Sequence, residues 1–154
     1  MVVLTEDKVS FMERALIEAR AAAARGEVPV GAVVVRDGVV LAAAGNATLA
    51  ANDPTAHAEI VALREAGARP GNARLDGCDL WVTLEPCALC AGAIVHARIS
   101  RLYYAAPDPK GGAVEHGPRF FGQPTCHHRP DVYSGMGQDR SAALLTDFFR
   151  KRRD

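Results

Sequence analysis

The chain has no net charge, few cysteines and no long apolar stretch, and each of these features argues against a class of protein. Basic and acidic residues number 18 each, which argues against a protein that holds nucleic acid by bulk electrostatics alone. No run approaches the roughly 18 consecutive apolar residues of a membrane span, and Glu6 and Asp7 are unlike a signal peptide. We therefore expect a cytoplasmic protein with no membrane segment.

The four cysteines include a Cys-x-x-Cys pair, Cys87 and Cys90. In a reducing compartment such a pair favours metal binding or redox chemistry over a disulfide framework. The 154 residues are 49% hydrophobic and 23% charged, which suits one compact unit with a full core. We predict a single domain over residues 1–154.

Helical and strand periodicities alternate along the chain. Thr5 is a candidate cap for a first helix that ends at Gly26, and Asp37-Gly38 is a turn signal between two β-branched runs. The later elements are strands over 30–35 and 39–44, a helix from Asp53-Pro54-Thr55 to about Gly67, a strand over 80–84, a helix from Pro86 to about His96, a strand over 102–106 and a helix over 141–153. The apolar residues in 107–137 recur with no helical or strand period, and a segment of this length without such a pattern indicates a functional loop.

Alternation of helices and strands implies crossover connections, and hence a partly parallel sheet with helices on both faces. The hairpin over 30–44 adds antiparallel strands at an edge. We therefore predict an α/β protein, a three-layer α/β/α sandwich around a mixed sheet of about five strands.

The most informative segments are His57-Ala58-Glu59 and Pro86-Cys87-Ala88-Leu89-Cys90. One imidazole and two thiolates, from His57, Cys87 and Cys90, are a zinc-type donor set. Three protein ligands leave the fourth tetrahedral position open for water, and Glu59 is a carboxylate suited to moving protons for that water. The pattern predicts one catalytic zinc ion per chain.

The two segments are expected at two helix starts. His57 and Glu59 would point roughly 200° apart in a regular helix, so they share a pocket only where the helix begins. Cys87 and Cys90 share a helix face, and the free N–H groups at a helix start stabilise thiolates. Glu85, directly before Pro86, is expected to orient its neighbours or to compensate the helix dipole.

A thiol redox pair and a structural zinc site are the competing interpretations. A redox pair leaves His57 and Glu59 unexplained. A structural site needs a fourth ligand, for which the candidates are His96, Cys78, Cys126, His127 and His128. The whole HxE…PCxxC spacing is the known signature of zinc deaminases, so we favour catalysis.

Segments around these motifs resemble the bacterial tRNA-specific adenosine deaminase family, within the cytidine deaminase-like superfamily. The resemblance spans almost the whole chain and rests on residues 26–33, 45–46, 53–60, 82–87, 90–93, 105–111 and 144–153. It implies a cytidine deaminase-like fold, one Zn²⁺ per chain and a homodimer. The implied reaction is hydrolysis of the wobble adenosine to inosine in a tRNA anticodon stem-loop, with release of ammonia.

The resemblance also implies residue roles. Glu59 would carry a proton from water to N1 of adenine and then help protonate the departing ammonia. Asn46 matches a position that contacts the target nucleoside. Asp108 matches one near the substrate backbone, where we expect it to bond a sugar hydroxyl or to position its loop. Val30 and Leu84 are expected in the pocket wall.

The last helix is expected to bury one face and to meet RNA with another. Leu144, Leu145 and Phe148 have the spacing of a buried face, whereas Phe149 lies one position round and is expected to touch flanking bases. Arg152 belongs to the cationic run 150–153, a footprint of phosphate contacts. The competing interpretation is that cations favour the negative end of a helix.

Two other functions remain open at this point. One keeps the chemistry but acts on a free base or nucleoside such as guanine or cytidine. The other is a non-catalytic binding module that zinc stabilises.

Overall fold

The computed structural model describes residues 2–69 and 73–153, with side chains for residues 11–69 and 73–152. Its elements are α1 (Val2–Ala24), β1 (Gly31–Arg36), β2 (Val39–Gly45), α2 (Ala58–Ala68), β3 (Cys78–Leu84), α3 (Ala88–Ala97), β4 (Arg101–Ala106), the 3₁₀ helix η1 (Phe120–Gly122), β5 (Asp131–Ser134) and α4 (Gln138–Arg153). None of the helices in these ranges is both long and apolar enough to cross a membrane.

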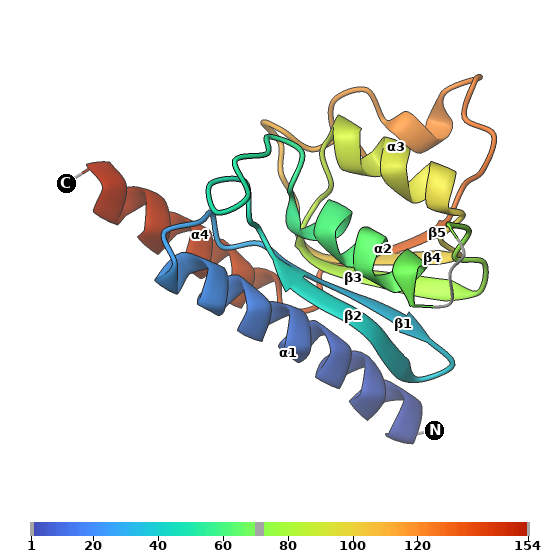
Figure 1. The fold of residues 1–154 in the computed structure, drawn as a ribbon, viewed down its shortest axis with the longest axis horizontal. Helices are drawn as coiled ribbons and strands as arrows, with labels where there is room; N and C mark the ends of the chain where they lie inside the picture. The colour runs from blue at the N-terminus through green and yellow to red at the C-terminus, as the bar shows by residue number, and fades with distance from the viewer. Residues whose placement is uncertain (1, 70–72, 154) are drawn as a thin grey trace.

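The strands form one mixed sheet in the order β2-β1-β3-β4-β5 (Figure 1). β1 is antiparallel to β2 and β3, whereas β3, β4 and β5 run parallel. The β1–β2 hairpin turns at Asp37 and Gly38, which both have positive φ angles, as a type I′ turn requires. The predicted hairpin, with β2 at an edge, is confirmed.

Helices cover both faces of this sheet. α2 and α3 lie on one face, and α1 and α4 lie together on the other (Figure 1). Ala32 and Val34 of β1 pack into the core on the α2 and α3 side, whereas Val33 and Val35 pack with residues of α1. Because the side chains on both faces of β1 are buried in the core, the strand has a continuous apolar sequence. The predicted three-layer sandwich with a mixed sheet is confirmed.

Helix α1 lies very close to the start of β1. A Cβ atom added to Gly31 would lie 1.9 Å from the carbonyl oxygen of Ala15 and 2.7 Å from the nitrogen of Ala19. Only glycine allows this approach, because any side chain would collide with the helix backbone. The contact fixes α1 against the start of β1.

The predicted starts of all four helices differ from the structure, and that of α3 differs least, since the helix begins at Ala88, two residues after Pro86. α1 begins at Val2, so Thr5 lies inside the helix and does not cap it. α2 begins at Ala58, after the Asp53-Pro54-Thr55 segment. Oδ1 of Asp53 instead accepts hydrogen bonds from the nitrogen of Thr55, at 2.9 Å, and from its hydroxyl, at 2.7 Å. Such a local turn competes with helix formation, which explains the later start.

The 107–137 segment, predicted as one loop, contains η1 and the edge strand β5. β5 has only four residues, none of them fully buried, so it shows no alternation long enough to predict a strand. α4 begins at Gln138, three residues before the predicted start at Ser141. Ser141 is fully buried and donates a hydrogen bond to the carbonyl oxygen of Thr83, which fixes α4 to the end of β3.

Candidate active site

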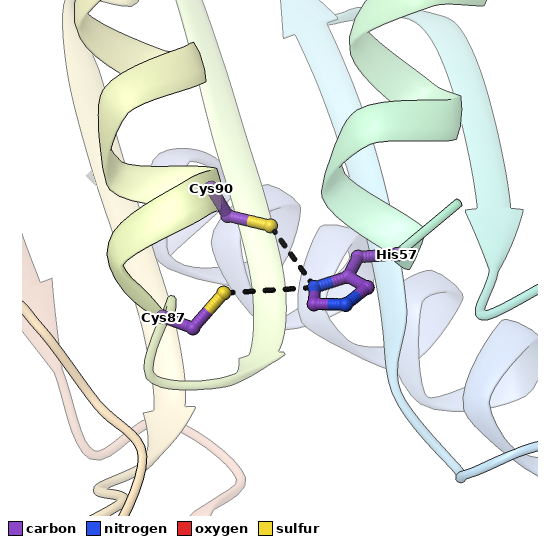
Figure 2. A group of neighbouring side chains, drawn as sticks. All are labelled: His57, Cys87 and Cys90. Atoms are coloured by element: carbon purple, nitrogen blue, oxygen red, sulfur yellow. Dashed lines mark hydrogen bonds between the residues drawn. The ribbon is translucent and has the colours of Figure 1, made fainter. Parts of the chain in front are cut away.

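Two helix starts face each other on one side of the sheet. His57 is the N-cap of α2, Cys87 is the N-cap of α3, and Cys90 lies in the first turn of α3. Neither cap residue makes a side-chain capping hydrogen bond, so the ring and the thiol are free to point into the space between the helices. Figure 2 shows the three side chains converging there.

The spacing of the three donor atoms fits a zinc ion. Nδ1 of His57 lies 3.6 Å from Sγ of Cys87 and 3.5 Å from Sγ of Cys90. A tetrahedral zinc ion with bonds of about 2.3 Å to sulfur and about 2.0 Å to nitrogen would separate the nitrogen and sulfur atoms by about 3.5 Å. Among the described residues, these three form the one group of His, Cys, Asp and Glu side chains that could hold a metal ion.

The candidates for a fourth protein ligand lie outside this group. Nε2 of His128 lies 2.7 Å from a backbone carbonyl oxygen, and the thiol of Cys126 donates to the carbonyl oxygen of His128 at 3.1 Å. His96 packs near His127, and Cys78 is buried at the start of β3. The three-ligand set therefore keeps the open position that a catalytic zinc site needs.

The pKa values of the two thiols shift in opposite directions because the thiols share a hydrogen bond. The bond with Cys90 is the main cause that lowers the pKa of Cys87 to about 5. The same bond and burial raise the pKa of the Cys90 thiol. Zinc ligation requires both sulfurs as thiolates, so binding of the ion displaces the remaining proton from Cys90.

Glu59 lies in the first turn of α2 and is only 4% exposed. Burial is the main cause that raises the pKa of its carboxyl to about 7, and the negative charge of Cys87 adds to the effect. A divalent cation beside it favours the charged form. A carboxyl whose pKa lies near neutral pH can both accept and return a proton, which is the property of a general acid–base group.

A cavity of about 320 Å³ opens beside the metal-binding residues. Its lining residues are Val28, Val30, Asn46, Thr48, His57, Glu59, Leu84, Glu85, Cys87, Asp108 and Gly111. Ligand pockets in proteins have volumes of about 300–1,000 Å³, so this one suits a small ligand. It joins the metal donors to the carboxyl of Glu59 in one space.

The structure separates the sequence-predicted substrate contacts into two groups. Val30, Asn46, Leu84 and Asp108 line the cavity, as expected. Phe149 and Arg152 instead line a second hollow of about 200 Å³. The two spaces adjoin, because Val28 and Thr48 line both.

The C-terminal helix leaves its aromatic pair near the surface. Phe148, expected in the buried face, is only half-buried, and Phe149 is 49% exposed and meets the Phe148 ring edge-on. The guanidinium of Arg152 lies 4.5 Å from the centre of the Phe148 ring and donates a hydrogen bond to the carbonyl oxygen of Gly26. The C-terminal part of α4 extends past the sheet (Figure 1), and Phe148 lines the second hollow together with Phe149 and Arg152.

Sequence reasoning missed Glu27, a buried carboxylate that is 2% exposed. It accepts hydrogen bonds from the nitrogens of Leu49, at 3.2 Å, and Ala50, at 2.9 Å, and from the amide of Asn46 at 3.5 Å. Burial raises its pKa, but the bonds from Ala50 and Leu49, the charge of Arg25 and a bond from Thr48 together outweigh burial and lower the pKa. A single glutamate before an apolar run carries no sequence signal for partners 22 and 23 residues away.

The chain is similar to known deaminases along most of its length. A sequence profile of the cytidine and deoxycytidylate deaminase zinc-binding region matches residues 5–106. The tRNA-specific adenosine deaminase of Agrobacterium fabrum is 60% identical over 147 residues, which cover 96% of this chain and 97% of that protein. This similarity extends well beyond the deaminase region and into α4.

Two solved structures share the fold. One, from a study of A-to-I editing by tRNA:A34 deaminases at the wobble position of transfer RNA, is 62% identical with a TM-score of 0.88, and the match covers 88% of this chain and 99% of that one. The other, a guanine deaminase from Nitrosomonas europaea, is 28% identical with a TM-score of 0.73, and the match covers 91% of this chain and 83% of that one. The fold alone thus serves more than one substrate.

Proposed function

The chain belongs to the zinc-dependent cytidine and deoxycytidylate deaminase family, and on that premise we propose that it deaminates adenosine to inosine in tRNA. We place the reaction at the wobble position of an anticodon stem-loop. The observation that carries the proposal is the 60% identity to a tRNA-specific adenosine deaminase over 96% of the chain. The site beside the cavity supplies the groups that the reaction needs.

The reaction replaces the 6-amino group of adenine with oxygen from water and releases ammonia. His57, Cys87 and Cys90 would hold the zinc ion, which would supply Lewis-acid activation of the attacking water. Glu59 accepts the proton of that water and delivers it to N1 of adenine while C6 is attacked. It then passes a proton to the departing nitrogen, because one carboxyl can act as base and acid in turn.

The cavity residues hold the target nucleoside in this proposal. Val30 and Leu84 provide apolar walls for the base, and the amide of Asn46 provides a donor and an acceptor. Asp108 stands at the edge of the cavity, where its carboxylate bonds a sugar hydroxyl or positions the loop. A base can enter this space only when it leaves the stack, and a single-stranded anticodon loop allows this at low cost.

The second hollow receives the neighbouring nucleotides. Phe149 offers an exposed aromatic face for a flanking base, and Arg152 stands beside it. Arg150 and Lys151 are exposed on the same helix and can approach phosphates, whereas the side chain of Arg153 lies outside the described residues.

Four substrates distinguish the candidate functions. We expect the zinc-loaded protein to form inosine in an anticodon stem-loop RNA and to leave free adenosine, cytidine and guanine unchanged. Mass spectrometry of the digested RNA and an ammonia assay give the readout. Turnover of guanine alone would establish the second candidate, a guanine deaminase, which the shared fold with the Nitrosomonas enzyme brings into consideration.

Replacement of Glu59 separates a catalyst from a zinc-stabilised binding module. Glu59→Ala is expected to keep one zinc ion per chain and its fold but to lower the deamination rate at least about 100-fold, because the proton carrier is gone. The exposed Glu65 on the same helix provides a matched control, and Glu65→Ala should behave like the wild type. Unchanged activity of Glu59→Ala would remove this residue from the mechanism.

We further propose that the chain works as a single domain, as a homodimer and in the cytoplasm, where its tRNA substrate would be found. An apolar hollow of about 630 Å³ between α2 and α3, lined in part by Leu63 and Ala93, offers a face that a second copy could cover. Light scattering after gel filtration measures the mass. A mass of one chain at micromolar concentration would contradict the dimer.

A further inference from the structure

Glu85 connects the sheet to the metal site. It directly follows Leu84, the last residue of β3, and stands two positions before Cys87. Its backbone nitrogen donates to the carbonyl oxygen of Ala106 at 2.8 Å, which continues the pairing of β3 with β4. Its side chain has no exposed surface, although it borders the cavity.

The Glu85 carboxylate is surrounded by hydrogen-bond donors from one segment of chain. Oε1 accepts from the nitrogen of Asp108 at 2.9 Å and lies 2.8 Å from Nδ1 of His116. Oε2 accepts from three consecutive nitrogens, those of Val114 at 3.1 Å, Glu115 at 3.0 Å and His116 at 3.1 Å. Residues 108–116 therefore wrap around a single side chain.

These five hydrogen-bond partners are the kind that a buried carboxylate requires. A carboxylate can only accept hydrogen bonds, and every donor around it is an N–H group. A buried charge without such partners would be costly, so the bonds and the segment's conformation depend on each other.

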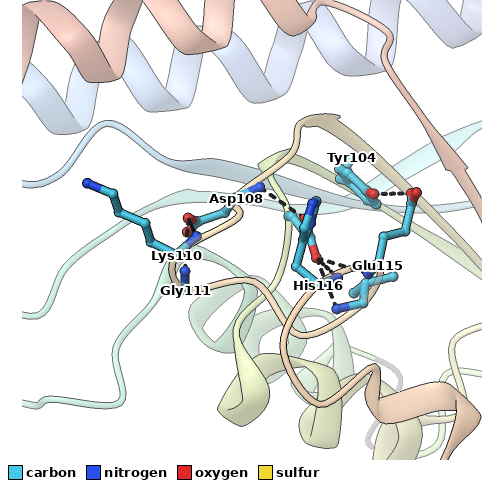
Figure 3. Close-up of polar contacts among 8 residues, drawn as sticks. Tyr104, Asp108, Lys110, Gly111, Glu115 and His116 are labelled. Carbon is cyan, nitrogen blue, oxygen red and sulfur yellow. Dashed lines mark hydrogen bonds and ion pairs between the residues drawn. The ribbon is translucent and has the colours of Figure 1, made fainter.

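The wrapped segment contains no helix or strand, and the bond from the nitrogen of Ala113 to the carbonyl oxygen of Pro86, at 2.9 Å, is one of its few other anchors. Figure 3 shows it looping from Asp108 past Lys110 and Gly111 to Glu115 and His116. Oδ1 of Asp108 accepts from the nitrogens of Lys110, at 3.2 Å, and Gly111, at 3.0 Å, which turns the chain at the cavity edge. Asp108 and Gly111 both line the cavity.

Gly112 shows how closely the segment fits the carboxylate. A Cβ atom added there would lie 2.5 Å from the carboxyl carbon and from Oε2 of Glu85, and 2.6 Å from the carbonyl oxygen of Asp108. Any side chain at this position would push the carboxylate and the segment apart.

We propose that Glu85 is a positioning residue for the substrate: its buried carboxylate holds residues 108–116 and so sets Asp108 and Gly111 against the target nucleoside. The proposal rests on the proposed function, because it assigns a role in binding the RNA. Glu85 is connected to Cys87 through Pro86 alone, so the carboxylate ties one wall of the cavity to the metal site. It takes no part in the proton transfer, which belongs to Glu59.

Glu85→Gln tests this role. The amide brings an NH₂ group against N–H donors, which breaks part of the arrangement at almost the same volume. We expect kcat/KM for the anticodon stem-loop to fall about 10- to 100-fold, because a small misplacement of positioning groups is costly. The loss should lie mainly in KM, with kcat within about threefold and one zinc ion per chain retained.

Amide hydrogen exchange tests the same role without any substrate. In Glu85→Gln the amides of Asp108, Val114, Glu115 and His116 should lose protection, while those of Leu49 and Ala50, which Glu27 holds, keep theirs. Glu65→Gln is the matched control, since it makes the same change at an exposed position of α2. It should leave KM and the exchange of residues 108 and 114 unchanged.

A second variant covers the case in which Glu85→Gln does not fold. Gly112→Ala keeps the charge of Glu85 but inserts a methyl group against it, so it should raise KM and expose the same amides. Retained protection in either folded variant, a KM within twofold of wild type, or a loss confined to kcat overturns the proposal. If the wild type shows no activity on RNA, the proposed function fails, while the exchange measurement still decides whether Glu85 holds the segment.

Discussion

The pKa values of two buried glutamates near the cavity, Glu59 and Glu27, shift in opposite directions. The difference comes from their hydrogen-bond partners. Burial dominates at Glu59, so the pKa of its carboxyl rises to about 7. Hydrogen bonds from Ala50 and Leu49, together with the charge of Arg25 and a bond from Thr48, outweigh burial at Glu27, so the pKa of that carboxyl is lowered. Glu59 is therefore suited to carry a proton. Glu27 instead stays ionised, and its carboxylate holds residues 46–50 through hydrogen bonds.

Glu27→Gln is expected to destabilise the protein at neutral pH, because the amide no longer satisfies the two backbone donors. The lowered pKa gives the wild-type carboxylate a stabilising contribution above its ordinary pKa of 4.5, and this contribution is lost as the pH falls through the folded value. The gap between the melting temperatures of variant and wild type should therefore stay steady from pH 7 to about pH 5 and narrow as the pH falls below 4.5. A constant gap would contradict the assignment. Glu65→Gln, at an exposed position of α2, serves as control.

At the scale of elements, helix starts determine the site. His57 and Glu59 reach one cavity because they are the cap and the second residue of α2, where the backbone is not yet regular. Cys87 and Cys90 stand at the start of α3, where free N–H groups favour thiolates. α4 has a different task, since it borders the second hollow and extends past the sheet.

The charges of α4 should matter for RNA and for nothing else in the reaction. Arg150→Gln with Lys151→Gln is expected to weaken binding of the anticodon stem-loop and to reduce the salt dependence of the binding constant by about 0.7 for each phosphate that the variant no longer neutralises. Filter binding at several salt concentrations measures both. Arg14→Gln with Arg20→Gln removes the same charge from exposed positions on α1 and should change neither. Equal effects of the two pairs would assign the weaker binding to net charge alone.

At the scale of the molecule, the metal site joins two helices of the same layer. His57 comes from the start of α2 and the cysteines from α3, so a zinc ion bridges two helices that pack on the same face of the sheet (Figures 1 and 2). Because zinc would bind the folded chain and not the unfolded one, it would stabilise the folded state in addition to activating water.

Removal of zinc should therefore lower the melting temperature. We expect a chelator to destabilise the wild type and added Zn²⁺ to restore it, with a saturation curve at one ion per chain. Glu59→Ala should show the same zinc-dependent shift, because Glu59 is not a ligand, whereas Cys87→Ala should show none. A melting temperature that does not respond to chelation, in protein shown by metal analysis to lose its zinc, would refute the stabilising bridge.

Much of the fold was predictable because its signals are local. The β1–β2 hairpin follows from Asp37-Gly38 between apolar runs, and the alternation of helices and strands indicates the layered sheet. β5 escaped prediction because four half-exposed residues have no periodicity, and the start of α2 was misplaced because the side chain of Asp53 forms its own turn.

The clustering of His57, Cys87 and Cys90 beside Glu59 was predictable from sequence alone, because ligand chemistry demands particular residue types at particular spacings. The tertiary structure decided everything that depends on contacts between distant segments. It separated Val30, Asn46, Leu84 and Asp108 from Phe149 and Arg152, and it enclosed Glu27 and Glu85 within loops far from them along the chain. A carboxylate acquires such a role only from the N–H groups that folding brings around it, and no local pattern in the sequence records them.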